Sequence, residues 1–246
     1  MNRNRTNIGT AVLVAAVVVI VSSLPAGATV VDFNSFFAGT VVAGEDPTGA
    51  TVSVNPYTEF ALSCVNGGSG PNSIVVFDSQ NPTGGDWDLG SPNEDFSGPG
   101  VGWGGSKHSS GANDRDWNNL LIIAEDVLDS DGDGLVDDPD DEGDGGVFIF
   151  EFEQAVAVLR VVLIDIDCDE TAEVRLFNSV GIVATLPAQA LGSNSVQALD
   201  ASAYLGIHRM EVELSSSGAI GEFEYVLDTT PVAQATWGSI KASYAR

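Results

Sequence analysis

Basic residues are scarce in this sequence of 246 residues, where 9 Lys and Arg stand against 35 Asp and Glu for a formal net charge of −26 at pH 7. A chain this acidic repels phosphate backbones and anionic lipid headgroups. The composition therefore excludes nucleic acid and anionic membrane surfaces as partners. Hydrophobic residues still make up 43% of the chain, which is enough to bury a core rather than leave the chain disordered.

Histidine is nearly absent, with only His108 and His208. Neither lies in an H-E-x-x-H or Cys/His zinc spacing, and the sequence holds no G-x-S-x-G nucleophile elbow. Pairs of carboxylates occur by chance among so many acids. Such pairs are Asp86 with Asp88 and Asp165 with Asp167. The sequence thus leaves an enzymatic role open but favours a protein that is not an enzyme, with no catalytic residue assigned.

Cysteine is limited to Cys64 and Cys168. In an exported protein, an even pair of cysteines is typical of a disulfide. Both residues lie in apolar, strand-like contexts, "FALSCV" and "LIDIDCD", where buried free thiols are equally common. The sequence leaves both states open.

The longest apolar run stands at the N-terminus. Arg3 and Arg5 precede "IGTAVLVAAVVVIVSSL", and Ala26 and Ala28 form a small-residue cleavage site. This arrangement predicts a secretory signal peptide over residues 1–28. An uncleaved membrane anchor is the alternative, but the run is short for a spanning helix. The mature chain is expected to be secreted or displayed at the cell surface, with no membrane span.

The rest of the chain consists of short β-branched and aromatic runs divided by Gly, Pro and Asn. Alternation in "HRMEVEL" and "EFEY" gives the inward positions Met210, Val212, Leu214, Phe223 and Tyr225. Alternation in "VVLIDIDCD" places the acids on a solvated face, namely Asp165, Asp167 and Asp169. The pattern predicts an all-β fold, an antiparallel two-sheet sandwich that is jelly-roll-like and spans residues 29–228. A long Gly/Asp-rich loop region runs from Gln80 to Asn118.

The stretch "DSDGDGLVDDPDDEGDGG" spans residues 129–146, and nine of its eighteen residues are acidic. An EF-hand-type calcium loop takes oxygen ligands from positions 1, 3, 5, 7, 9 and 12, with Gly at position 6. Counting from Asp129 fills every position and places Gly134 at the turn. The predicted calcium ligands are Asp129, Asp131, Asp133, the carbonyl of Leu135, Asp137 and Asp140.

Position 12 of this loop is Asp rather than Glu, which resembles the calcium loops of dockerins and thrombospondin type 3 repeats. A structural calcium site is therefore expected rather than a sensor. The alternative is a solvated acidic insert. The acids that follow are expected to be solvated, namely Asp141, Glu142 and Asp144.

Three of the four tryptophans fall in the Gly-rich loops, at Trp87, Trp103 and Trp117. Aromatic faces stack on sugar rings, and neighbouring carboxylates accept hydrogen bonds from sugar hydroxyls. These tryptophans, with Asp86 and Asp88, are the candidate ligand-binding residues. The alternative is that the tryptophans pack as a small core beneath the long loop.

Six segments follow one another in a familiar order: "DFNSFFAGTVV", "VVFDSQNPTGGDWDLGSPN", "NNLLIIAED", "DDPDDEGDGGVFIFEFE", "VVLIDIDCDE" and "GSNSVQAL". This succession resembles a family of exported bacterial β-sandwich domains that often occur in proteins with PEP-CTERM or related anchors, and it covers most of Val31 to Tyr225. The resemblance implies an extracellular, calcium-associated, lectin-like module with no established enzymatic activity. It also implies that "FDSQNPTGGDWDLG" and "DIDCDE" lie outside the core. The chain departs from the family in lacking a hydrophobic C-terminal anchor, and its "DSDGDGLVD" is an insertion relative to the family's shorter "DPDD" loop.

The C-terminal segment 229–246 ends in "TWGSIKASYAR". It resembles short Trp-Gly-x-Ile-Lys tails that end many exported proteins of environmental bacteria and would serve as sorting signals. An ordinary terminal strand or frayed tail is the alternative.

The first function hypothesis is a secreted, calcium-stabilised module that binds extracellular or cell-surface polysaccharide. The second is a structural surface or matrix protein in which calcium rigidifies loops and no small ligand binds. A glycan-active hydrolase or lyase ranks third.

Overall fold

The computed structural model describes residues 27–53, 59–93, 111 and 113–228. Residues 1–26 of the expected signal peptide, the loop residues Trp103 and His108, and the tail 229–246 lie outside the described residues.

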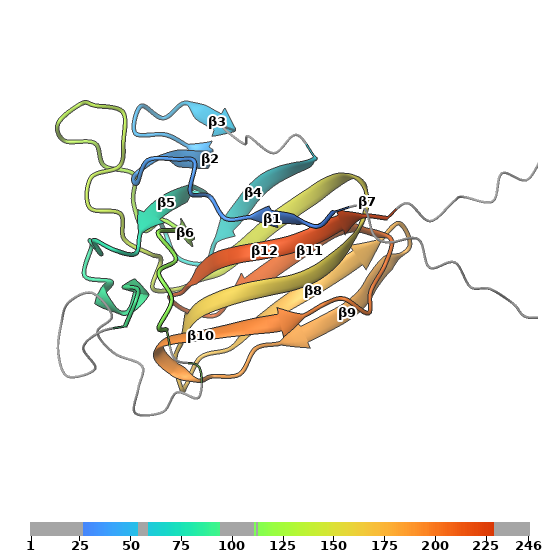
Figure 1. The fold of residues 1–246 in the computed structure, drawn as a ribbon. Helices are drawn as coiled ribbons and strands as arrows, with labels where there is room; N and C mark the ends of the chain where they lie inside the picture. The colour runs from blue at the N-terminus through green and yellow to red at the C-terminus, as the bar shows by residue number, and fades with distance from the viewer. Residues whose placement is uncertain (1–26, 54–58, 94–110, 112, 229–246) are drawn as a thin grey trace, which may run out of the picture.

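Twelve strands and one short 3-10 helix form in the described part of the chain (Figure 1). Their bounds are β1 (Thr29–Val31), β2 (Val41–Glu45), β3 (Thr51–Ser53), β4 (Phe60–Asn66), β5 (Ile74–Asp78), η1 (Trp87–Leu89), β6 (Asn119–Ile123), β7 (Gly146–Ile166), β8 (Ala172–Asn178), β9 (Gly181–Pro187), β10 (Gly192–Asp200), β11 (Ile207–Leu214) and β12 (Ala219–Leu227). All pairings between these strands are antiparallel. Within the same residues, no helix has the length and apolar character needed to cross a membrane.

Strand β7 is 21 residues long and belongs to two layers. Its first half pairs with β4 and β11, and β11 leads on to β8 and β9, which together form the first layer. Its second half pairs with β10 and β12, and β12 leads on through β6, β5 and β2 to β3, which form the second layer. The predicted all-β, antiparallel, jelly-roll-like sandwich is confirmed, with the addition that its two layers are one hydrogen-bonded sheet folded over along β7.

The main core lies between the two layers. Phe150 of the first layer meets Phe223 of the second with ring centroids 4.9 Å apart, and Phe60, Phe152 and Tyr225 complete the aromatic cluster. The inward positions that alternation predicts in β11 and β12 are all buried in this core, namely Met210, Val212, Leu214, Phe223 and Tyr225. Period-2 patterning was therefore a correct guide for these strands.

The second layer is buried on both faces. Leu121 and Leu163 face the main core, whereas Leu120, Ile122 and Ile164 pack in a separate cluster on the opposite face. Every residue of β6 is consequently buried. The expectation of one solvated face was wrong for the end of β7, because loops cover it.

Asp165 shows the consequence most clearly, since only 2% of its surface is exposed. Its φ of 63° lies in the left-handed region, which is uncommon for a residue with a side chain. The register of β10 against β7 shifts at this point, between Gly192 and Val196. A bulge therefore interrupts the alternation at Asp165 and turns its carboxylate inward.

Both cysteines are free thiols, so the disulfide alternative is not realised. Cys64 is buried in the main core, and burial raises the pKa of its thiol to about 12. Cys168 is exposed just beyond β7.

Candidate functional site

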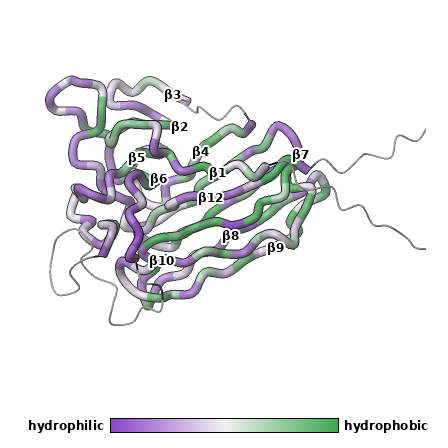
Figure 2. The backbone as a smooth tube through the Cα atoms, viewed as in Figure 1, coloured by the Kyte–Doolittle hydropathy of each residue, from purple (hydrophilic) through white to green (hydrophobic). Residues whose placement is uncertain are grey.

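Three segments cover the outer face of the second layer, and we call residues 79–93, 113–118 and 124–142 the loop layer. Each contributes an apolar anchor to the second cluster: Leu89, Trp117 and Val136 are all buried there against residues of the sheet. Figure 2 shows hydrophilic backbone gathered in these loops beside β5 and β6. The loop layer thus combines an apolar underside with a strongly acidic composition.

Asp129 shapes the acidic loop. One oxygen of its carboxylate accepts hydrogen bonds from the backbone N–H of Gly132 at 2.7 Å and of Asp133 at 3.2 Å, and the other accepts from Gly134 at 2.9 Å. These donors, Gly134 first, hold the pKa of Asp129 below its ordinary value. Gly134 has a φ of 89°, a conformation that glycine adopts freely. The backbone therefore turns at the position predicted for the calcium loop.

The loop is closed and attached to the sheet at its second half. The N–H of Asp137 donates to the carbonyl of Leu128 at 2.8 Å, and the carboxylate of Asp137 accepts from Ser130 N–H at 2.6 Å. The N–H of Val136 donates to the carbonyl of Gly39 at 2.8 Å. A side chain at Gly39 would lie 2.5 Å from the Val136 carbonyl, so this close approach requires glycine.

Three of the six predicted calcium ligands converge. Asp129, Asp131 and Asp137 each offer a carboxylate oxygen, and these oxygens lie within 4.8 Å of one another. Asp133 is exposed and outside this group, and its carboxylate accepts from Leu135 N–H at 2.9 Å.

The prediction that Asp140 is the last calcium ligand of this loop is wrong, because its carboxylate does not join those of Asp129, Asp131 and Asp137. Its carboxylate instead lies within 4.8 Å of those of Asp86 and Asp141. The reason is local docking: Glu125 N–H donates to the Asp140 carbonyl at 3.0 Å, and Gly84 sits directly against the Asp140 side chain.

Asp86, Asp140 and Asp141 form the outer half of what we call the buried carboxylate cluster. The Asp86 carboxylate accepts from Asp141 N–H at 2.8 Å, and the Asp141 carboxylate accepts from Gly218 N–H at 2.5 Å. The carboxyl groups of Asp86 and Asp140 share a hydrogen bond. Asp141 is only 5% exposed, so the expectation that it is solvated was wrong.

Asp88, Asp165 and Asn194 form the inner half of the same cluster. The Asp165 carboxylate accepts from Asn194 N–H at 2.5 Å, and the side-chain amide of Asn194 donates to the carbonyls of Asp88 at 2.5 Å and Gly90 at 2.8 Å. Asn194 is 1% exposed, and its side-chain oxygen has no hydrogen-bond partner.

Burial and mutual repulsion dominate the electrostatics of this cluster. Burial, with the charges of Asp140 and Asp88, raises the pKa of Asp86 to about 7. Burial, followed by the charge of Asp86, raises the pKa of Asp141 well above its ordinary value. Burial and the charge of Asp88 do the same for the pKa of Asp165. These carboxyls cannot all be ionised together at neutral pH without a positive charge among them.

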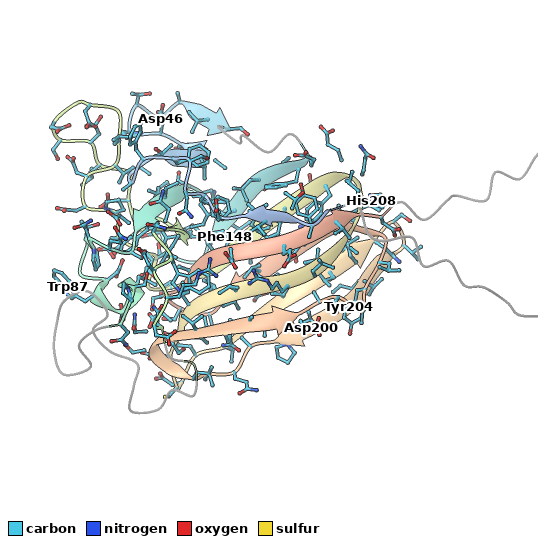
Figure 3. The ribbon with its side chains drawn as sticks, viewed as in Figure 1. Asp46, Trp87, Phe148, Asp200, Tyr204 and His208 are labelled. Carbon is cyan, nitrogen blue, oxygen red and sulfur yellow. The ribbon has the colours of Figure 1, made fainter. Side chains whose placement is uncertain are left out.

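Trp103 lies outside the described residues, and the other predicted glycan-binding residues do not form one surface. Trp87 is 40% exposed and stands at the edge of the loop layer (Figure 3). Its neighbours Asp86 and Asp88 turn inward to the buried carboxylate cluster. Trp117 is 7% exposed, its indole N–H donates to Asn113 at 2.9 Å, and Arg115 lies over its ring. Trp117 is thus a core residue, as the packing alternative predicted. Of the two loop tryptophans that the structure describes, only Trp87 is exposed to solvent.

Sequence reasoning missed Asp141, Asp165 and Asn194 as members of one site. They come from three of the segments that carry the family resemblance, "DDPDDEGDGG", "DIDCDE" and "GSNSVQAL", while Asp86 and Asp88 come from a fourth. The sequence therefore contained these residues in polar segments, but nothing in the spacing of the segments showed that they meet in the fold.

No protein-family model matches the chain, and no curated protein matches it. One solved structure with which it aligns is a family 32 carbohydrate-binding module from C. perfringens NanJ in complex with galactose. The alignment has 11% sequence identity and a TM-score of 0.25 and covers 50% of this chain and 88% of the module. A TM-score this low does not establish a shared fold. The architecture described above is therefore based on the strand pairing and core packing of this chain alone.

Proposed function

We propose that this protein is an exported, calcium-stabilised β-sandwich module that binds extracellular or cell-surface polysaccharide through its loop layer. Export follows from the N-terminal segment and from the resemblance to exported bacterial β-sandwich domains. Calcium binds in the acidic loop through Asp129, Asp131 and Asp137, because carboxylate oxygens at this spacing suit a hard cation. Extracellular calcium is abundant enough to fill a site of modest affinity.

The observation that carries the binding role is the placement of Trp87. Its indole is exposed while both neighbours and Leu89 are held inward, so the short helix η1 presents the ring at little entropic cost. A fixed, amphipathic aromatic face is suited to stacking on a sugar ring. The acidic surroundings favour neutral or cationic polysaccharides over anionic ones.

The test is affinity electrophoresis of the mature protein through gels that contain neutral, amino-sugar or anionic polysaccharides, with calcium present. We expect retardation by a neutral or amino-sugar polymer, and we expect Trp87→Ala to weaken it about tenfold, the loss of roughly one aromatic contact. Phe37→Ala is the matched control, because Phe37 is an 80% exposed aromatic residue on a different loop and should leave binding unchanged.

The second candidate is a structural surface protein in which cations rigidify the loops and no glycan binds. The inward carboxylates of Asp86 and Asp88 and the burial of Trp117 favour this alternative. It predicts no retardation by any of the polymers, with or without calcium, and that result would replace the binding proposal.

A further inference from the structure

The buried carboxylate cluster joins segments that are far apart in the sequence. Asp86 precedes η1 and Asp88 lies within it. Asp140 and Asp141 stand at the end of the acidic loop, and Asp165 is the last residue but one of β7. The backbone packs tightly around the outer half, since Thr83 donates to the Pro139 carbonyl at 3.0 Å and a side chain at Gly84 would lie 2.6 Å from Asp140. These acids are thus held together by the fold and are not free to move apart.

Among the described residues, no arginine pairs with an acid of the cluster. The described part of the chain contains four basic residues, all arginine. Arg115 and Arg160 pair with Glu222, while Arg175 and Arg209 pair with Glu211 on the first layer. Every arginine in the described residues is therefore engaged by glutamates on the strands.

A second observation is a buried acceptor beside the cluster that has no donor. The side-chain oxygen of Asn194 is a good acceptor, yet it is buried without a donor. The residue is fixed between Asp165, which accepts from its backbone N–H, and Asp88, whose carbonyl accepts from its side-chain amide. An unpaired buried acceptor is costly, and beside carboxylates it needs a donor or a cation.

We propose that the buried carboxylate cluster is a second divalent-cation site, separate from the group formed by Asp129, Asp131 and Asp137, in which Asp86, Asp140 and Asp141 bind calcium. The ligand atoms are all oxygens, which suit calcium rather than zinc or copper. Asp88, Asp165 and the Asn194 oxygen supply the negative field on the inner side. The proposal does not rest on glycan binding, because its ligands are carboxylates and its test measures calcium alone.

The cation has a structural task in this proposal. It ties the residue that precedes η1 to the end of the acidic loop, so that two distant chain segments share one bound charge. Without the cation, the three converging carboxylates have only one another as charged neighbours at the site, which weakens the packing of the loops that carry them. The site therefore couples docking of the loop layer to the calcium concentration.

The test is Asp141→Asn, because asparagine has the same shape and its oxygen can still accept from Gly218 N–H. The variant and the mature wild-type protein are titrated with calcium alone by isothermal calorimetry and melted in calcium and in chelator. We expect two bound ions in the wild type and one in the variant. In calcium the variant should melt about 5–10 °C lower, whereas in chelator it should melt at least as high, because one buried acid is gone.

The change in melting temperature is expected to be negative in calcium and zero or positive in chelator. This difference distinguishes a cation ligand from an ordinary buried residue, whose loss would have the same effect in both conditions. A variant that melts lower by the same amount in calcium and in chelator, or that still binds two ions, overturns the proposal. Asp200→Asn is the matched control, because Asp200 is an exposed acid at the end of β10. Asp131→Asn removes the acidic-loop site alone, so loss of that site leaves the second binding event and this proposal intact.

Discussion

Glu222 is 2% exposed on β12, and two arginines determine its charge. Arg115 donates to its carboxylate at 2.9 Å and Arg160 at 2.5 Å. Burial raises the pKa of Glu222, but these hydrogen bonds outweigh burial and hold the pKa below its ordinary value. A carboxyl whose folded pKa is lowered stabilises the protein above its unfolded pKa of about 4.3, and that contribution is lost as the pH falls through the folded pKa.

We therefore expect Glu222→Gln to lower the free energy of unfolding at pH 7 by about 1–3 kcal/mol, because the carboxylate that balances two guanidinium groups becomes a neutral amide whose NH2 end cannot accept a hydrogen bond from either. The deficit relative to wild type should shrink as the pH falls below about 4.3. Urea unfolding between pH 7 and pH 3 measures both effects. Glu213→Gln, which weakens the half-exposed pair with Arg175, is the control and should cost under about 1 kcal/mol. A deficit independent of pH would contradict the argument.

At the scale of the element, the acidic loop owes its shape to Asp129, and the proposed calcium site depends on the carboxylates that converge with it. Asp129 accepts three backbone hydrogen bonds, whereas Asp131 accepts only one, from Asp133 N–H at 3.1 Å. Asp131→Asn therefore tests the calcium site with little damage to the loop. We expect its melting temperature to match wild type in chelator and to show several degrees less stabilisation in millimolar calcium.

Scanning calorimetry in both conditions gives this result, with Asp46→Asn as control. Asp46 is also an acid that organises a turn by accepting backbone hydrogen bonds, but among the described residues it belongs to no group of three or more side chains that could hold a metal ion. If Asp131→Asn loses none of the calcium-dependent stabilisation, the acidic loop is a solvated insert.

Sequence periodicity predicted these elements well where one rule governed them. Alternation placed Phe223 and Tyr225 in the core, and the spacing of acids placed the turn at Gly134, since both depend only on neighbouring residues. It failed at Asp165, where a left-handed residue interrupts the alternation. It failed also at Asp140, because docking against Gly84 is a contact between distant segments that spacing along the chain cannot show.

The whole molecule is a sandwich in which the second layer has two different covers. On one side it faces the first layer across a core of aromatic and aliphatic residues, and on the other it faces the loop layer through a few apolar anchors. The first contact is made by apolar packing, whereas the loop layer carries 14 acids and one arginine, half of the net charge of −26. The sequence showed the acidity and the hydrophobicity, but not that loops rich in acids cover an apolar outer face of the second layer.

This division predicts that calcium removal loosens one side of the molecule only. In chelator, backbone amides of the loop layer, such as those of Asp141 and Glu142, should exchange hydrogen at least about tenfold faster than in calcium, because local opening then costs less. Amides that pair β8 with β11 should keep their protection. Hydrogen exchange read by mass spectrometry measures both sets in one sample.

The double variant Asp131→Asn/Asp141→Asn in calcium is the matched control, and it should reproduce the wild-type pattern in chelator. Equal acceleration in both layers would mean that the sandwich opens as one unit and that the loop layer is not a separate cover. Unchanged exchange everywhere would mean that the apolar anchors Leu89, Trp117 and Val136 hold the loops without any cation. Only selective loosening fits a fold whose outer cover is held by bound ions and whose core is held by packing.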